Sequence, residues 1–250
     1  MVCGADVIIF NKQFWQNNFR FGSNERAQNI RRHTSYKTRD MRLVTITWAE
    51  PDTSRVWGVD VSGTWDGNVS FTVTKAAGAS FAIIKSIDGT IPTRYWLENT
   101  QRSQDAGLIT GPYGWLYPNK YVDCKAQARA QFERVRTVKK QLPHTIDFEW
   151  TTYAGQTANP NYTDLDLYAT EFIRLSGYKP ILYSAAGYMN PLGKMPDALK
   201  AKFSALWIAN YGVLVPQLPI GFSDWDFHQF AASGEAARFA PNDTGKLELD

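Results

Sequence analysis

The sequence predicts a protein of the α/β class with an irregular, TIM-like (β/α) barrel, in which βα units come first and bare strands follow at the C-terminal end. Three observations predict this fold. From residue 56 onward, short apolar runs alternate with stretches of helical periodicity, which is typical of βα units around a parallel sheet or barrel. After residue 205 the apolar runs follow one another too closely to leave room for full helices. The chain of 250 residues is long enough for one barrel-sized domain.

Each apolar run is short enough to be one strand. The eight runs that predict strands span residues 56–61, 80–85, 108–114, 144–150, 180–184, 205–210, 226–231 and 245–249. Helices are expected between the early strands, at residues 93–106, 123–141 and 164–176. Gly107 and Gly177 follow the first and third of these helices, where a left-handed residue commonly ends a helix, and Pro143 follows the second.

Residues 1–55 do not follow this alternation. We predict that they form an N-terminal extension of unknown fold, and that the barrel domain spans residues 56–250. The extension carries nine Lys and Arg against five Asp and Glu, a net +4, whereas the whole chain carries +3. Two stretches within it, residues 5–10 and 43–48, have strand character. Its basic residues indicate either a solvated segment or a surface that attracts an anionic polymer.

The cysteines, histidines and apolar runs exclude several classes of protein. Cys3 and Cys124 are the only cysteines, so the sequence contains no disulfide framework and no zinc-ligand spacing. None of the three histidines is at metal-ligand spacing. The apolar run at residues 7–10 is too short for the core of a signal peptide or for a membrane span. We therefore expect no metal or other cofactor, no insertion into a membrane and no export signal.

Asp147 and Glu149 end one of the predicted strands and suggest a chemistry. Side chains alternate between the two faces of a strand, so these acids project to the same side about 7 Å apart. A glycosidic bond is hydrolysed by a proton donor and a second carboxylate that lie roughly 5–9 Å apart. The pair therefore indicates a glycosidase. The alternative interpretation is structural, with one acid capping the next helix and the other forming an ion pair on the surface.

Other polar residues are expected at the same rim as this pair, because reactive groups in a (β/α) barrel gather at the carboxyl ends of the strands. Strand by strand, the polar residues at these ends are Asp60, Ser62, Lys85, Asp88, Tyr113, Asp147, Glu149, Tyr183, Asn210 and Tyr211. Four of them are carboxylates, and the aromatic side chains among them can hold sugar rings. The set as a whole favours a glycosidase more strongly than the triplet alone.

Seven segments of the sequence match, in order, the strands of a known glycosidase family. They are GVDVS at 58–62, FAIIK at 81–85, GLITGPY at 107–113, IDFE at 146–149, GYKPILY at 177–183, LWIANY at 206–211 and DWDFHQF at 224–230. On these segments the chain resembles glycoside hydrolase family 25, the Chalaropsis-type lysozymes, which include many phage endolysins. The resemblance extends from residue 56 to the C-terminus and implies that residues 56–250 are the catalytic barrel.

The resemblance implies a lysozyme, a β-1,4-N-acetylmuramidase that cuts between N-acetylmuramic acid and N-acetylglucosamine in peptidoglycan. Glu149 matches the general acid, and Asp147 matches the carboxylate that stabilises a substrate-derived intermediate or assists the nucleophile. Asp60 and Asp224 match two further acids of the rim. The candidate substrate-binding residues are Trp65, Lys85, Tyr113, Trp115, Tyr183, Trp207, Tyr211 and Gln229.

The expected partner is bacterial peptidoglycan, with no nucleic acid, and the expected state is a monomer. As a phage or prophage endolysin, the protein would stay in the host cytoplasm until a holin-type factor releases it to the cell wall. Two alternatives stay open. One is a chitinase-like glycosidase, whose motif carries further acids upstream on the same strand, where this chain has Pro, His and Thr at 143–145. The other is a barrel that binds glycans without cleaving them.

Overall fold

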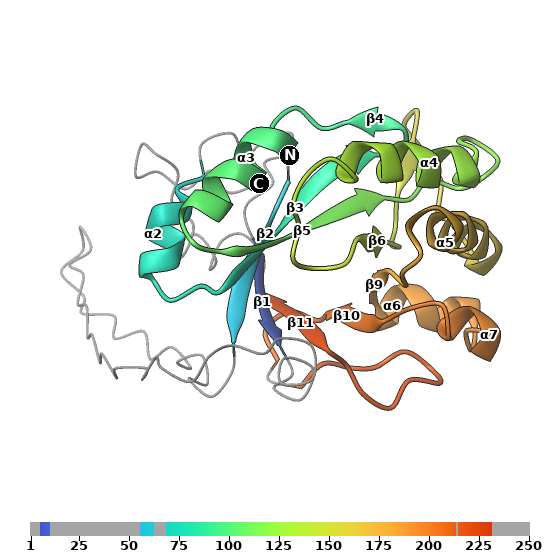
Figure 1. Ribbon diagram of the computed structural model, residues 1–250. Coiled ribbons are helices and arrows are strands. Elements are labelled where there is room, and N and C mark those ends of the chain that lie inside the picture. Colours follow the sequence, from blue (N-terminus) through green and yellow to red (C-terminus); the bar gives the residue numbers. More distant parts are fainter. Residues whose placement is uncertain (1–5, 11–55, 63–68, 214, 232–250) are drawn as a thin grey trace.

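The computed structural model describes residues 6–10, 56–62, 69–213 and 215–231, and the strands of this part form a barrel with helices outside it (Figure 1). The barrel strands are β1 (Asp6–Phe10), β2 (Trp57–Val61), β3 (Phe81–Asp88), β5 (Ile109–Trp115), β6 (Thr145–Asp147), β9 (Ile181–Ala185), β10 (Ala205–Ala209) and β11 (Phe227–Ala231). Each pairs with the next in this order, and β11 pairs back to β1, so the ring is closed. The six pairings from β2 to β11 are parallel. The predicted fold class is confirmed.

Strand β1 lies inside the segment that we expected to form an extension. It pairs antiparallel with β2 on one side and with β11 on the other, and in Figure 1 it runs between them. We expected the regular structure to begin at residue 56 and the eighth strand to be 245–249, which lies outside the described residues. The physical reason for the difference is that β2 and β11 would each present an unpaired edge without β1, and unpaired backbone groups are costly.

The other predicted strands are confirmed to within a few residues, with one informative difference. Strand β6 ends at Asp147, whereas the apolar run predicted a strand to residue 150, because the chain bends at Glu149. The bend leads into a two-stranded hairpin, β7 (Thr152–Tyr153) and β8 (Gln156–Thr157), which was not predicted. A further short strand, β4 (Ile91–Pro92), pairs with the end of β3.

Helices cover the outside of the strands (Figure 1). They are α2 (Phe71–Ala76), α3 (Trp96–Asp105), α4 (Cys124–Val135), α5 (Tyr162–Ser176), α6 (Ala186–Met189), the 3-10 helix η1 (Asn190–Leu192) and α7 (Asp197–Lys200). The described residues between β10 and β11 contain no helix, as the spacing of the apolar runs predicted. Helix α2 was not predicted, because the three β-branched residues at 72–74 weaken its helical signal. Helix α4 ends at Val135, earlier than the predicted residue 141.

The helix ends at Gly107 and Gly177 follow the sequence prediction. Both glycines have positive φ, 79° and 75°, the left-handed conformation that glycine adopts without a steric penalty. Helix α5 begins with a capping box, in which the Asn161 side chain accepts from the Asp164 backbone N–H and the Asp164 carboxylate accepts from the Asn161 N–H. These caps fix where α5 starts, and α5 packs against α4 beside β6.

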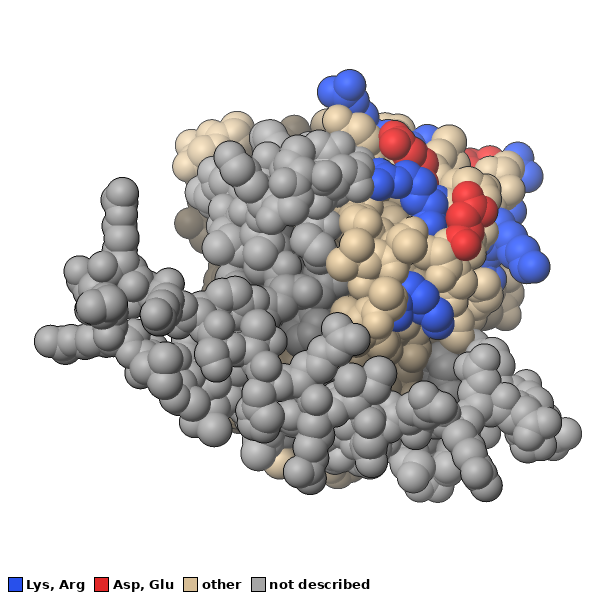
Figure 2. Space-filling model, turned by 90° about the vertical axis from the view of Figure 1, so that its left-hand side faces the viewer, with Lys and Arg blue, Asp and Glu red and all other residues tan. Residues whose placement is uncertain are grey.

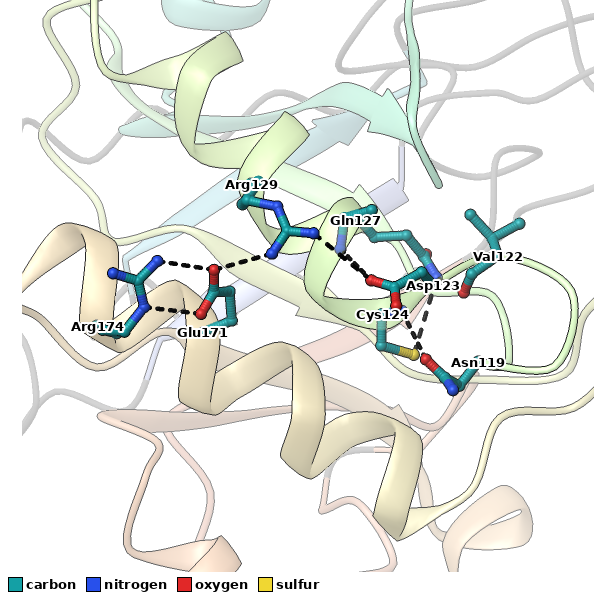
Figure 3. Close-up of polar contacts among 9 residues, drawn as sticks. Asn119, Val122, Asp123, Cys124, Gln127, Arg129, Glu171 and Arg174 are labelled. Carbon is teal, nitrogen blue, oxygen red and sulfur yellow. Dashed lines mark hydrogen bonds and ion pairs between the residues drawn. The ribbon is translucent and has the colours of Figure 1, made fainter.

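Polar contacts join α4 to α5 and to the loop that follows β5 (Figure 3). Arg129 on α4 contacts Asp123 at 3.8 Å and Glu171 on α5 at 3.2 Å, while Arg174 donates two hydrogen bonds to Glu171. These bonds from Arg174, followed by the pairing with Arg129, lower the pKa of Glu171 to about 2. Gln127 donates to the carbonyls of Tyr117 and Val122 and accepts from the Tyr117 N–H. The loop after β5 is therefore held in one conformation.

The surface shown in Figure 2, which lies on the α2 and α3 side, carries both signs of charge. Among the described residues of that face, Lys and Arg side chains lie next to Asp and Glu side chains and form no patch of a single sign. Within the part of the chain that the structure describes, no helix is both long enough and apolar enough to cross a bilayer.

Candidate active site

The acid pair lies at the carboxyl end of β6. Asp147 is the last residue of β6, opposite Trp115 of β5 and Tyr183 of β9, and is only 3% exposed. Phe148, between the two acids, points the other way into the core between strands and helices and is fully buried. Glu149 is partly buried, and its carboxyl group lies close enough to that of Asp147 to affect its pKa. Strand β6 places only Asp147, and the bend at Glu149 brings the second acid close enough to act on the first.

The surroundings of the pair favour the protonated form of both acids. Burial is the largest effect, and it raises the pKa of Glu149 from 4.5 to about 7. Burial also raises the pKa of Asp147 well above its ordinary value, and the charge of Glu149 adds to this. The positive charge of Lys85 acts in the opposite direction on both acids. Burial therefore keeps a proton on the pair at a higher pH than ordinary carboxyl groups would. The Oδ1 atom of Asp147 is buried and has no hydrogen-bond partner among the residues that the structure describes.

Lys85 comes from β3 and lies in the same rim as the pair. It is 8% exposed, forms an ion pair with Asp88 at 3.2 Å and places its Nζ atom 4.6 Å from the centre of the Trp115 ring. Trp115 in turn donates a hydrogen bond from Nε1 to Thr151 at 2.9 Å. The charge of Asp88 contributes to the raised pKa of Asp147, so this acid also lies in the electrostatic field of the pair.

Hydrogen bonds link Asp60 to Tyr183, whose pKa responds to the charges of the acid pair. Gln229 on β11 donates from Nε2 to the Asp60 carboxylate at 2.7 Å, and its Oε1 accepts from Tyr183 at 2.8 Å and from Tyr211 at 3.0 Å. Burial raises the pKa of Tyr183 well above its ordinary value, and the charges of Glu149, Asp147 and Asp60 raise it further. Tyr183 thus lies among the three acids, and the structure brings together the predicted Asp60, Tyr183, Tyr211 and Gln229.

Strand β1 adds a residue to this rim that the sequence analysis left in the extension. In the antiparallel pairing of β1 with β2, Asp6 is the register partner of Asp60. The sequence signal for this residue is an acid directly before the apolar run at 7–10. We noted the strand character of this run but did not assign it to the barrel.

Asp224 is not part of the acid cluster, and this corrects the prediction. It precedes β11 by three residues, and β11 is parallel to β10, so Asp224 lies at the opposite end of the barrel from Asp147. Its side chain is exposed and accepts a hydrogen bond from the Trp225 N–H at 2.8 Å. The match to the family segment correctly predicted a strand near Asp224. It did not show that Asp224 lies before the start of this strand and not at its carboxyl end.

The remaining predicted binding residues differ in where they lie. Trp207 is 2% exposed, and its ring meets that of Tyr183 at 4.6 Å, so it supports Tyr183 and offers no free face to a ligand, contrary to prediction. Tyr113 packs against the interior of the barrel, in the same cluster as Trp207. Trp65 lies outside the described residues. Trp150 and Tyr153, two exposed aromatic residues that follow the acid pair, were not among the predicted binding residues.

Comparisons with known proteins identify the family. The model of the glycosyl hydrolases family 25 matches residues 59–238. Lysozyme M1 of Streptomyces globisporus is 30% identical over 195 residues, which are 73% of this chain and 64% of that protein, so the chain spans less than two thirds of this relative. The bacterial lysozyme of Streptomyces coelicolor is 29% identical with a TM-score of 0.64, over 73% of this chain and 87% of that chain. A muramidase of Acremonium alcalophilum has the same fold, with 24% identity and a TM-score of 0.61 over 69% of this chain and 86% of that one. The predicted resemblance is confirmed, and the chain belongs to glycosyl hydrolase family 25.

Proposed function

We propose that this protein is a lysozyme, a β-1,4-N-acetylmuramidase that hydrolyses the bond between N-acetylmuramic acid and N-acetylglucosamine in bacterial peptidoglycan. The observation that carries the proposal is the buried pair of Asp147 and Glu149, in which the pKa of Glu149 is about 7. A general acid works best when its pKa lies near the working pH. Membership of family 25 and the relatives named lysozyme or muramidase support the same function.

In the proposed reaction, Glu149 is the general acid. Its carboxyl proton passes to the glycosidic oxygen as the bond from that oxygen to the anomeric carbon breaks, and the departing sugar leaves as an alcohol. The positive charge that develops on the ring is stabilised by Asp147. Glu149, now a carboxylate, then takes a proton from the water molecule that attacks the anomeric carbon, and the site returns to its starting state.

The role of Asp147 has two forms that fit its surroundings. Its carboxylate can accept a hydrogen bond from the N–H of a substrate acetamido group, whose carbonyl oxygen then attacks the anomeric carbon. Alternatively, the carboxylate attacks that carbon itself. Asp60 has a supporting role in both forms, because Gln229 links it by hydrogen bonds to Tyr183, which lies in the electrostatic field of the pair.

The experiment that tests the function is mass spectrometry of the fragments that the full-length chain releases from purified peptidoglycan. Fragments with muramic acid at the reducing end support a muramidase. Glucosamine at the reducing end would replace it with a glucosaminidase or a chitinase-like enzyme, and the absence of any released fragment would favour a barrel that only binds glycans. Whether the chain acts as a phage or prophage endolysin is a separate proposal, which host lysis on co-expression with a holin would test.

A further inference from the structure

Three aromatic side chains are exposed in the part of the chain that the structure describes, and all three follow barrel strands at the carboxyl rim. Trp150 and Tyr153 come after β6, with exposed fractions of 52% and 39%, and Tyr211 comes after β10. Single exposed apolar residues are common on proteins and need no explanation. Here, however, three exposed rings lie on the same rim as the acids. One of them, Tyr211, also donates a hydrogen bond to Gln229.

The Trp150 ring is held in place by its neighbours. It meets the Tyr188 ring edge to face at 5.2 Å, and it passes so close to Gly187 that a Cβ atom there would lie 3.4 Å from the indole. The Tyr188 hydroxyl donates a hydrogen bond to the Pro160 carbonyl, so its ring is fixed in turn. The charge of Glu149 contributes to the raised pKa of Tyr188, after burial and the charge of Asp164. One aromatic ring therefore separates Trp150 from the surroundings of the acid pair.

Tyr153 is held on the opposite side of β6. Its ring stacks on Tyr121 at 5.0 Å and meets Tyr117 at 5.7 Å, and both of these residues belong to the loop after β5 that Gln127 fixes. Burial raises the pKa of Tyr117, and its contact with Asp88 raises it further. Because β6 lies between β5 and β9 in the ring, Tyr153 is supported from one side of β6 and Trp150 from the other.

The hairpin that carries Tyr153 is fixed at its base. Thr151, between the two exposed aromatic residues, accepts a hydrogen bond from the Ala158 N–H at 2.9 Å and donates its own N–H to Asn159 at 3.0 Å. Its hydroxyl accepts from Trp115 in the acid rim. At the tip, Ala154 and Gly155 have φ values of 50° and 76°, the two consecutive left-handed residues of a type I′ turn. Exposed rings on a fixed support bind a ligand with a smaller loss of conformational entropy.

We propose that Trp150 and Tyr153 form two further carbohydrate subsites, which hold sugar rings of the same β-1,4-linked glycan beyond the two rings joined by the cleaved bond. The inference rests on the proposed function, because the proposed ligand of these subsites is the glycan that a muramidase cleaves. Both rings are continuous with the acid rim through Tyr188 and Tyr117. The C–H face of a pyranose ring packs against an aromatic face, and an indole that is half exposed and rigidly held provides such a face.

The test compares substrates of different length. Trp150→Ala and Tyr153→Ala would be assayed on peptide-free glycan oligomers prepared from peptidoglycan, using the shortest oligomer that the wild type cleaves and an octasaccharide. We expect each variant to lower kcat/KM for the octasaccharide by about 2- to 13-fold, the effect of losing one aromatic contact, and to leave the shortest oligomer unaffected. Leu97→Ala is the matched control, because Leu97 is also 52% exposed but lies on α3. The Kd of the octasaccharide for Glu149→Gln, with and without Trp150→Ala, should change by the same factor.

The outcomes separate the two proposals. Loss that is confined to the longer substrate supports the subsites. Unchanged kcat/KM on the octasaccharide, or an equal loss on both lengths, would overturn them while the wild-type activity upholds the function. If the folded wild type cleaves and binds neither oligomer, the function itself is wrong, and the inference falls with it.

Discussion

Replacing Glu149 by Gln should remove activity and at the same time make the folded protein more stable above neutral pH. Gln keeps the shape of the side chain but cannot donate the proton, and loss of a general acid costs about 10²–10⁴ in rate. In free energy this is about 3–5 kcal/mol of transition-state stabilisation. The two effects have opposite signs because the position is arranged for chemistry and not for stability.

The gain in stability follows from the pKa of Glu149. In the folded protein it is raised from 4.5 to about 7, so between these values the folded state binds more protons than the unfolded state. Stability therefore falls as pH rises through this window and stays lowered above it. The difference in pKa corresponds to about 3 kcal/mol. A side chain that is neutral at every pH avoids this loss.

The assay is thermal melting of the wild type and of Glu149→Gln at pH 5 and pH 8, beside the rate at which each releases fragments from peptidoglycan. For a chain of this length, about 3 kcal/mol corresponds to a difference in Tm of roughly 6–12 °C at pH 8, which should shrink toward zero at pH 5. Fragment release near the wild-type rate by the folded variant would refute the role of Glu149 as the acid. A difference in Tm that does not grow with pH would refute the raised pKa.

Other changes separate the remaining groups of the rim. Lys85→Met should move the alkaline limb of the kcat/KM profile to higher pH, because the Lys85 charge lowers the pKa of both acids. Asp88→Asn should move this limb to lower pH, because the Asp88 charge raises the pKa of Asp147. A shift of the limb in the same direction for both variants would contradict this reasoning. Asp224→Asn should leave kcat/KM within about twofold, as for other exposed sites, and a tenfold loss in a folded variant would return Asp224 to the site. Deleting residues 1–10 should lower the Tm seen by circular dichroism, because β1 pairs with both β2 and β11; an unchanged Tm would show that the barrel closes without β1.

Local sequence patterns predicted the position of a residue correctly where that position depends only on its neighbours along the chain. Asp147 lies at the rim because it is the last residue of a short buried strand, and Gly177 ends α5 because the left-handed conformation is a property of one residue. The placement of Asp60 at the rim followed in the same way from the end of β2. In each case the determining interaction is local, so periodicity and residue type predict it.

The predictions that failed depended on contacts between distant parts of the chain. The pairing of β1 joins residues near the start of the chain to β11 near its end, and no local pattern encodes which edge a strand will cover. Asp224 was placed by similarity to a family segment, whereas its position follows from the direction of β11 in the ring. Trp207 looks like other rim aromatics in sequence, and only the packing against Tyr183 shows that it is buried.

The residue between the two acids connects the chemistry of the rim with the aromatic surface around it. Phe148 is fully buried, and its ring contacts Tyr188 at 5.0 Å while its backbone N–H donates to the Tyr183 carbonyl. Tyr188 is also the residue that holds Trp150. The side chain that keeps both acids facing inward therefore packs on the same ring that keeps the indole facing outward. A substitution at Tyr188 would disturb the acid pair and the outer aromatic surface together, so Trp150 itself, and not its support, is the position at which glycan binding can be tested apart from bond cleavage.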